Sequence, residues 1–142
     1  MNVVLAVACD QARVRPDGKM DIVGAFDALY APGFPAVQER MTAVFVLEWD
    51  EDESGRHEFS ADLVDADGTR VLTIEGHTDV EERPVDRAPA RTRIVMPMER
   101  VVFPHAGRYR FVLEVDGHEC PAFSLFVGEQ PDGADPTEGE RV

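Results

Sequence analysis

The sequence predicts an all-β protein: a single antiparallel β-sandwich of about eight strands, with Greek-key connections of the immunoglobulin or C2 type. Hydrophobic residues recur at every second position along most of the chain, whereas helical spacing does not recur. Turn residues separate these runs at the intervals typical of sandwiches. The chain has 142 residues, of which 44% are hydrophobic, and this suffices for one packed domain.

Three strands are predicted in the first third of the chain. Residues 3–8 are apolar on both faces, so we expect this strand in the middle of a sheet that is covered on both sides. Residues 20–30 form the next strand, which is entered through a turn at residues 16–19. Residues 31–35 contain two prolines and predict a loop. Apolar residues alternate again in residues 41–49, which predicts the third strand.

A hairpin and one further strand follow. Polar and apolar side chains alternate in residues 58–63, and a turn at residues 65–68 leads into the partner strand over residues 69–76. Residues 91–98 predict another strand, in which a proline indicates an edge or a strand end. Residues 81–90 contain two prolines and are the crossover that a Greek key requires between its sheets.

The final hairpin is the clearest of all. Charged and apolar side chains alternate strictly in residues 108–116, the Asp116-Gly117 pair supplies a tight turn, and residues 121–127 return as the partner strand. Tyr109 lies where many sandwiches anchor a loop through a tyrosine hydroxyl. The residues that we expect in the core are Val4, Leu5, Val7, Ile22, Phe26, Phe45, Leu47, Trp49, Phe59, Leu63, Leu72, Ile74, Ile94, Met96, Tyr109, Phe111, Leu113, Phe123 and Leu125.

The acidic residues are unevenly distributed along the chain. The formal net charge is −14, and most of the excess lies in residues 48–68 and 128–142. We therefore expect a sandwich domain over residues 1–127 and a disordered acidic tail over residues 128–142. Nucleic acid is not expected as a partner, because phosphate binding requires a positive surface.

The beginning of the chain resembles a lipoprotein signal only superficially. No Lys or Arg precedes the short apolar stretch before Cys9, so a first strand is the better interpretation. No apolar run is long enough for a membrane span, and we expect no membrane partner. Cys9 and Cys120 do not have the spacing of a metal or redox motif, which predicts reduced, buried thiols in a cytoplasmic protein.

The acidic segment after the third strand resembles a calcium-binding loop. Oxygen-bearing side chains occupy positions 1, 3, 5 and 9 of that pattern, and Gly55 stands where the loop requires a sharp turn. The candidate ligands are Asp50, Asp52, Ser54 and Glu58. However, Ala61 replaces the glutamate that should close the site. The alternative is a solvated hairpin loop whose charges prevent a sheet edge from pairing.

Other chemistry finds little support in the sequence. His118 and Cys120 share a strand face and could supply two ligands to a zinc or copper ion, but a histidine at the edge of a turn and a core cysteine explain the pair without a metal. None of the serines lies in a nucleophile elbow. We therefore predict no catalytic residues and no cofactor, with calcium as the exception that the acidic loop allows.

Several short motifs are similar to those of a family of small bacterial proteins of unknown function. The residues that carry the resemblance are Cys9-Asp10, Gly18-Lys19, Ile22, Gly24, Phe26, Phe34-Pro35 and the segments 64–68 and 106–117. The resemblance extends over residues 1–127. It implies a single β-sandwich without an established activity, and it assigns no catalytic residue.

These observations predict a non-catalytic protein-interaction or assembly module, which acts through a sheet face or edge on a protein partner or on itself. The first alternative is a calcium- or small-ligand-binding sandwich that uses the acidic loop at residues 50–58. The second is a hydrolase, which would require a deep pocket lined by a histidine or cysteine with nearby acids.

Overall fold

The computed structural model describes residues 1–84, 86–120 and 123–131 of the chain. These residues form eleven strands and no helix, which confirms the predicted all-β class. No helical segment capable of crossing a lipid bilayer is found in the described chain. The strands are β1 (Asn2–Cys9), β2 (Gln11–Val14), β3 (Met20–Val23), β4 (Ala28–Ala31), β5 (Ala36–Glu48), β6 (Gly55–Val64), β7 (Arg70–Val80), β8 (Arg91–Phe103), β9 (Gly107–Val115), β10 (His118–Cys120) and β11 (Ser124–Glu129).

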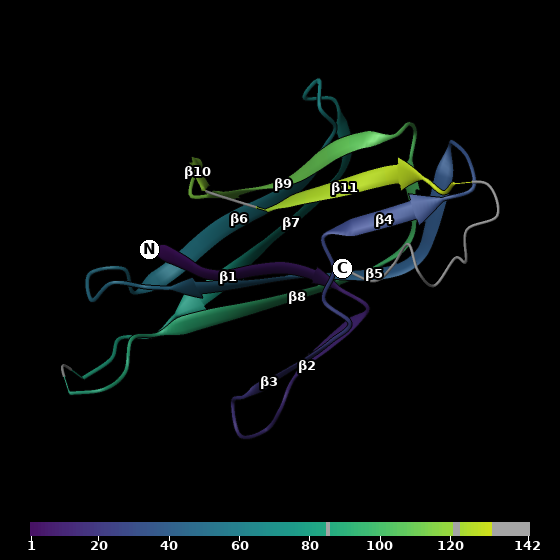
Figure 1. Ribbon diagram of the computed structural model, residues 1–142. Coiled ribbons are helices and arrows are strands. Elements are labelled where there is room, and N and C mark those ends of the chain that lie inside the picture. Colours follow the sequence, from purple (N-terminus) through teal and green to yellow (C-terminus); the bar gives the residue numbers. More distant parts are fainter. Residues whose placement is uncertain (85, 121–122, 132–142) are drawn as a thin grey trace.

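Two sheets face one another across a shared hydrophobic core (Figure 1). The smaller sheet has three strands in the order β1-β5-β8. The larger sheet has the order β4-β11-β9-β6-β7, and the short strand β10 pairs with β9. Strands β2 and β3 form a separate hairpin, which projects from the body on the side of the smaller sheet (Figure 1).

The predicted antiparallel sandwich of eight strands is wrong in two respects. The described chain has eleven strands, and the larger sheet is mixed, because β11 runs parallel to β4. The predicted strand over residues 20–30 is divided between β3 and β4, which belong to different sheets. Gly24 causes the break: its φ is +69°, and an added Cβ would collide with the carboxylate of Asp10.

The end of the sandwich lies slightly later than predicted. Strand β11 continues through Gly128 and Glu129, which pair with Tyr30 and Ala31 of β4, so the predicted boundary at residue 127 falls inside a strand. Most of the predicted acidic tail, residues 132–142, lies outside the described residues.

Strand β5, and not β1, is the strand that is covered on both faces. All residues from 41 to 47 are buried. One face of β5 packs into the core between the sheets, where Phe45 contacts Phe111 and Phe123 at ring-centroid distances of 6.3 and 5.8 Å. On the other face, Val44 and Val46 form a second cluster that the β2–β3 hairpin covers.

The prediction that residues 3–8 lie in the middle of a sheet is wrong. Strand β1 is an edge strand of the smaller sheet, and it pairs with β5 alone along most of its length. Consequently two predicted core residues are exposed, Val4 to 41% and Leu5 to 37%. The other expected core residues are buried, pack against the core, or pack beneath the hairpin, as Val7 and Ile22 do.

The expectation for Tyr109 is confirmed. Its ring is fully buried and packs edge-on against Phe103, with the ring centroids 5.0 Å apart. The hydroxyl donates a hydrogen bond to the carbonyl of His105 at 2.6 Å and accepts one from the His105 amide at 3.3 Å. This pair of contacts fixes the β8–β9 connection against the larger sheet, as a tyrosine corner does.

We predict that Tyr109→Phe lowers the free energy of unfolding by about 1 kcal/mol, because it removes the hydroxyl from both contacts with His105 and keeps the ring. Chemical denaturation followed by tryptophan fluorescence measures this difference. Tyr30→Phe is the matched control, since the Tyr30 ring is exposed. Equal stability of the two variants would contradict an anchoring role for the Tyr109 hydroxyl.

Candidate functional site

The acidic loop predicted to bind calcium connects β5 to β6. Its backbone folds on itself: the amide of Asp50 donates to the Glu53 carboxylate at 2.8 Å, and the amide of Glu53 donates to the Asp50 carbonyl at 3.1 Å. The terminal ammonium of Met1 lies 3.2 Å from the Asp50 carboxylate and 2.7 Å from that of Glu53. The carboxylates of Asp50 and Glu53 are therefore both paired with the ammonium group of Met1.

The predicted calcium ligands do not converge in the described structure. Asp52 and Ser54 are exposed loop residues, and Glu58 lies in β6, where it is opposite His77 of β7. Across residues 1–84, 86–120 and 123–131, no three His, Cys, Asp or Glu side chains are grouped so that they could hold a metal ion. Calcium binding by Asp50, Asp52, Ser54 and Glu58 stays a prediction.

The calcium hypothesis predicts that millimolar calcium raises the Tm above that measured in EDTA, because a ligand that binds only the folded state stabilises it. Asp52→Ala should abolish the increase, since it removes the oxygen atoms of a predicted ligand. Glu75→Gln, on β7, is the control and should leave the increase intact. An identical Tm with calcium and with EDTA would contradict the hypothesis.

The two cysteines are free and lie in different hydrophobic clusters, Cys9 beneath the hairpin and Cys120 beside the main core. Burial raises the pKa of both thiols above the usual value, and the charge of Asp10 raises that of Cys9 further. Both groups are therefore protonated at neutral pH, which makes them weak nucleophiles and weak metal ligands.

His57 of β6 connects the acidic loop to the end of β9. Its Nδ1 lies 2.5 Å from the Asp116 carboxylate, and its Nε2 lies 2.6 Å from the backbone carbonyl of Glu53. The imidazole also stacks on Trp49, with the ring centroids 4.2 Å apart. Both partners of the ring nitrogens are acceptors, so both nitrogens must carry a proton, and the bound form is the imidazolium.

The pKa values of this pair agree with that protonation state. Burial lowers the pKa of His57, but the hydrogen bonds to Asp116 and to the Glu53 carbonyl outweigh it, and the pKa lies above its usual value. The hydrogen bond from His57 holds the pKa of Asp116 below the usual range. We call His57, Asp116 and the Glu53 carbonyl the imidazolium clamp.

The clamp predicts a definite pH dependence of stability. Because the folded state raises the pKa of His57, the clamp stabilises fully below the histidine's unfolded pKa, and the contribution is lost as the pH rises through the folded value. The folded state lowers the pKa of Asp116, so the stability that its ionised carboxylate contributes is lost as the pH falls through that lowered pKa. We expect His57→Gln to cost about 1 to 2 kcal/mol near pH ~6, and less at pH ~9.

Urea denaturation of wild type and variant at several pH values measures this difference. His77→Gln is the control, because His77 lies on the exposed face of β7 and outside the clamp. A cost of His57→Gln that does not change with pH would contradict a charged imidazole.

A second feature of the structure is the free edge of β1. At the end of the strand the Ala8 carbonyl accepts a hydrogen bond from the Phe26 amide at 2.9 Å, so the peptide groups of Ala8 face away from β5. Peptide groups alternate in direction along a strand, and those of Ala6 therefore face the same way. Over Asn2 to Val7 no described strand other than β5 pairs with β1. The only irregularity is a bulge between Val3 and Leu5.

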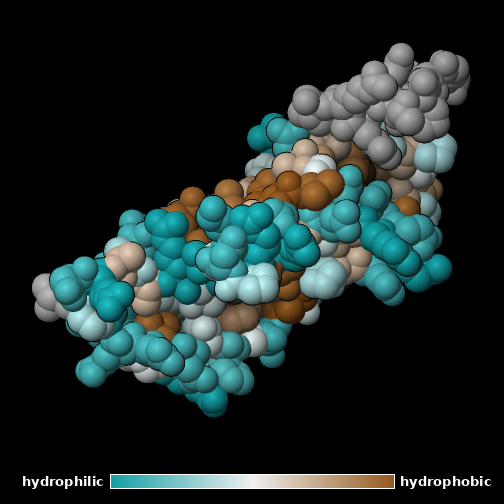
Figure 2. Space-filling model, turned by 90° about the horizontal axis from the view of Figure 1, so that it is seen from below, coloured by the Kyte–Doolittle hydropathy of each residue, from teal (hydrophilic) through white to brown (hydrophobic). Residues whose placement is uncertain are grey.

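A hollow runs beside this edge. It has a volume of about 320 Å³ and is lined by residues 1–6 and by Cys120 of β10. Figure 2 shows apolar surface gathered along the molecule and bordered by hydrophilic side chains. The exposed Val4 and Leu5 side chains contribute apolar surface at the edge itself.

The other edges of the two sheets have protecting features that β1 lacks, although β1 is itself interrupted by the bulge between Val3 and Leu5. Strand β8 contains a proline and four charged residues, and Arg100 sits at φ +53°, a conformation that disturbs regular pairing. Strand β7 presents Glu75 and Asp79 to solvent, and β4 has only four residues. The eight residues of β1, by contrast, include no charge, no proline and no glycine.

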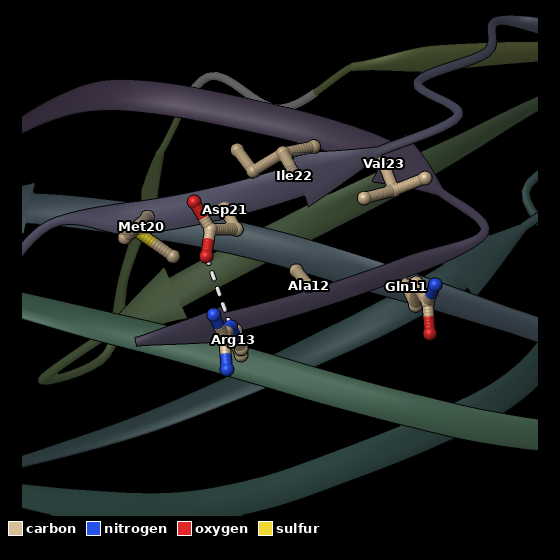
Figure 3. A pocket seen from close by; sticks show the side chains of 7 residues that line it. All are labelled: Gln11, Ala12, Arg13, Met20, Asp21, Ile22 and Val23. Atoms are coloured by element: carbon tan, nitrogen blue, oxygen red, sulfur yellow. Dashed lines mark hydrogen bonds and ion pairs between the residues drawn. The ribbon is translucent and has the colours of Figure 1, made fainter. Parts of the chain in front are cut away.

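Another hollow lies on the β2–β3 hairpin. Its volume is about 610 Å³, and Figure 3 shows Arg13 and Asp21 pointing toward one another across it. Their side chains form an ion pair at 2.9 Å. The two charges therefore neutralise each other on the surface of the hairpin.

The sequence predicted neither the imidazolium clamp nor the free edge of β1. The clamp joins His57 and Asp116, which are 59 positions apart, and no local pattern links them. Residues 3–8 contain no polar residue, and this pattern is unusual for an edge strand. However, the pattern alone does not distinguish a central strand from an edge strand.

Comparison with known proteins gives one match. Residues 4–128 match the model of a family of unknown function, DUF6941. The match covers most of the chain, so the resemblance predicted over residues 1–127 is confirmed. No curated protein and no solved structure matches the chain. The chain belongs to the DUF6941 family.

Proposed function

We propose that this member of the DUF6941 family is a non-catalytic protein-interaction or assembly module, and that it binds an extended protein segment along the edge of β1. The observation that carries the proposal is an uncharged strand that, over Asn2 to Val7, pairs on one side only within the described chain. An extended segment placed beside β1 would complete those hydrogen bonds, as in strand addition to a sheet edge.

Affinity and specificity would come from different groups. Each backbone hydrogen bond contributes about 0.5–1.5 kcal/mol net, so a few of them provide measurable but reversible binding. Side chains of the bound segment would contact Val4 and Leu5, and the hollow beside residues 1–6 offers room for one of them. No cofactor takes part.

The same proposal places the protein in the cytoplasm, where two free thiols remain reduced. Neither nucleic acid nor membrane is proposed as a partner, because a formal charge of −14 repels phosphates and anionic lipid headgroups.

Site-specific photo-cross-linking tests the proposal. We expect a photoreactive amino acid at position 5 to form covalent adducts with a protein segment in a lysate of the native host, because Leu5 lies at the binding edge. Mass spectrometry of the adducts identifies the segment and its point of attachment.

The matched control is the same photoreactive residue at position 14. Val14 is a hairpin residue that is 46% exposed, compared with 37% for Leu5. Adducts that are as abundant from position 14 as from position 5, or no adducts from position 5, would refute binding at the β1 edge.

A further inference from the structure

We propose that the segment bound along β1 is the β1 strand of a second copy of the chain. This inference rests on the function proposed above and narrows it to self-association. The two β1 strands would lie antiparallel about a two-fold axis and join two smaller sheets into one continuous sheet of six strands, three from each copy.

The composition of β1 supports this inference. From Val3 to Ala8 the strand is apolar on both faces, a pattern typical of strands in the interior of a sheet. The folded chain nevertheless places it at an edge, with Val4 and Leu5 exposed. Pairing with a second β1 would make β1 an interior strand of the joined sheet and would bring the exposed Val4 and Leu5 of the two copies next to one another.

The edge of β1 meets the condition that two-fold pairing imposes on charge. A two-fold contact brings the same surface together from both sides, so any charge on it would face its own image. Strand β1 carries no charge, and no like charges would therefore be opposed within the paired strands. Apolar cross-strand pairs such as those between Val4 and Leu5 of the two copies are favourable in antiparallel sheets.

The extent of the pairing follows from what already occupies the edge. The Phe26 amide binds the Ala8 carbonyl, so a second strand can pair only with residues 2–7. The partner's residues would meet the free peptide groups of Ala6 and the bulge at Val4. The symmetric arrangement gives each copy the same six residues of contact.

Net charge opposes the association over a longer range. Each copy carries a formal charge of −14, and two such chains repel one another. Salt screens this repulsion and leaves strand pairing largely unaffected, so the dimer should become more stable as the salt concentration rises.

Sedimentation equilibrium of the purified full chain over a range of concentrations tests the proposal. We expect a monomer–dimer equilibrium with a Kd that falls as salt is added. Leu5→Lys should raise the Kd at least about tenfold, because it places two like charges beside the two-fold axis. Val14→Lys is the matched control: it adds the same charge at an exposed hairpin position and should leave the Kd within about twofold of wild type.

A second variant in β1 and a measurement of folding show whether a loss of the dimer comes from a folding defect. Ala6→Pro removes the outward amide donor of Ala6 and should also abolish the dimer, while circular dichroism verifies that both variants keep their strands. A wild-type chain that remains monomeric at every concentration, or a dimer that survives both β1 variants, would overturn self-pairing. If position 5 then still cross-links to a different protein in lysate, only the self-pairing fails, whereas the absence of any adduct refutes the proposed function as well.

Discussion

The burial of β5 on both faces is the constraint on which the rest of the structure depends. Because its residues 41–47 are apolar or buried in succession, the strand needs cover on each side. Phe111 of the larger sheet and Phe123, which precedes β11, cover one side, and the β2–β3 hairpin covers the other. Strands β1 and β8 then complete the hydrogen bonds of β5, and this arrangement leaves the outer edge of β1 without a partner.

Alternation in the sequence correctly predicts the strands whose two faces differ. Phe111 and Leu113 are fully buried as expected, and the hydroxyl of Tyr109 anchors its loop. Alternation fails where both faces are apolar, since it cannot tell β1 from β5. Which of the two becomes the central strand depends on pairing between segments far apart in the chain, and periodicity contains no information on that. The division of residues 20–30 depends likewise on the contact between Gly24 and Asp10.

The acidic residues have structural partners that spacing alone did not reveal. Asp65 is buried, and its carboxylate accepts hydrogen bonds from the amides of Asp67 and Thr69 and lies 3.2 Å from the His105 ring. These bonds, led by that of Thr69, hold the pKa of Asp65 below its usual range. Asp116 follows β9, and its carboxylate accepts a hydrogen bond from the Glu58 amide of β6 and contacts His57 in the imidazolium clamp. Acidic residues of this chain therefore take part in a turn and in the imidazolium clamp.

The free edge of β1 links the fold to the proposed function. Strand β1 has the apolar composition of a strand from the middle of a sheet, but it lies at the edge of the smaller sheet. The most direct measurement is the hydrogen exchange rate of the Ala6 amide in the wild-type chain as a function of protein concentration. Self-pairing of β1 predicts that exchange slows as the concentration rises, because a second β1 strand then binds that amide. An Ala6 amide that exchanges at the same rate at every concentration would contradict it.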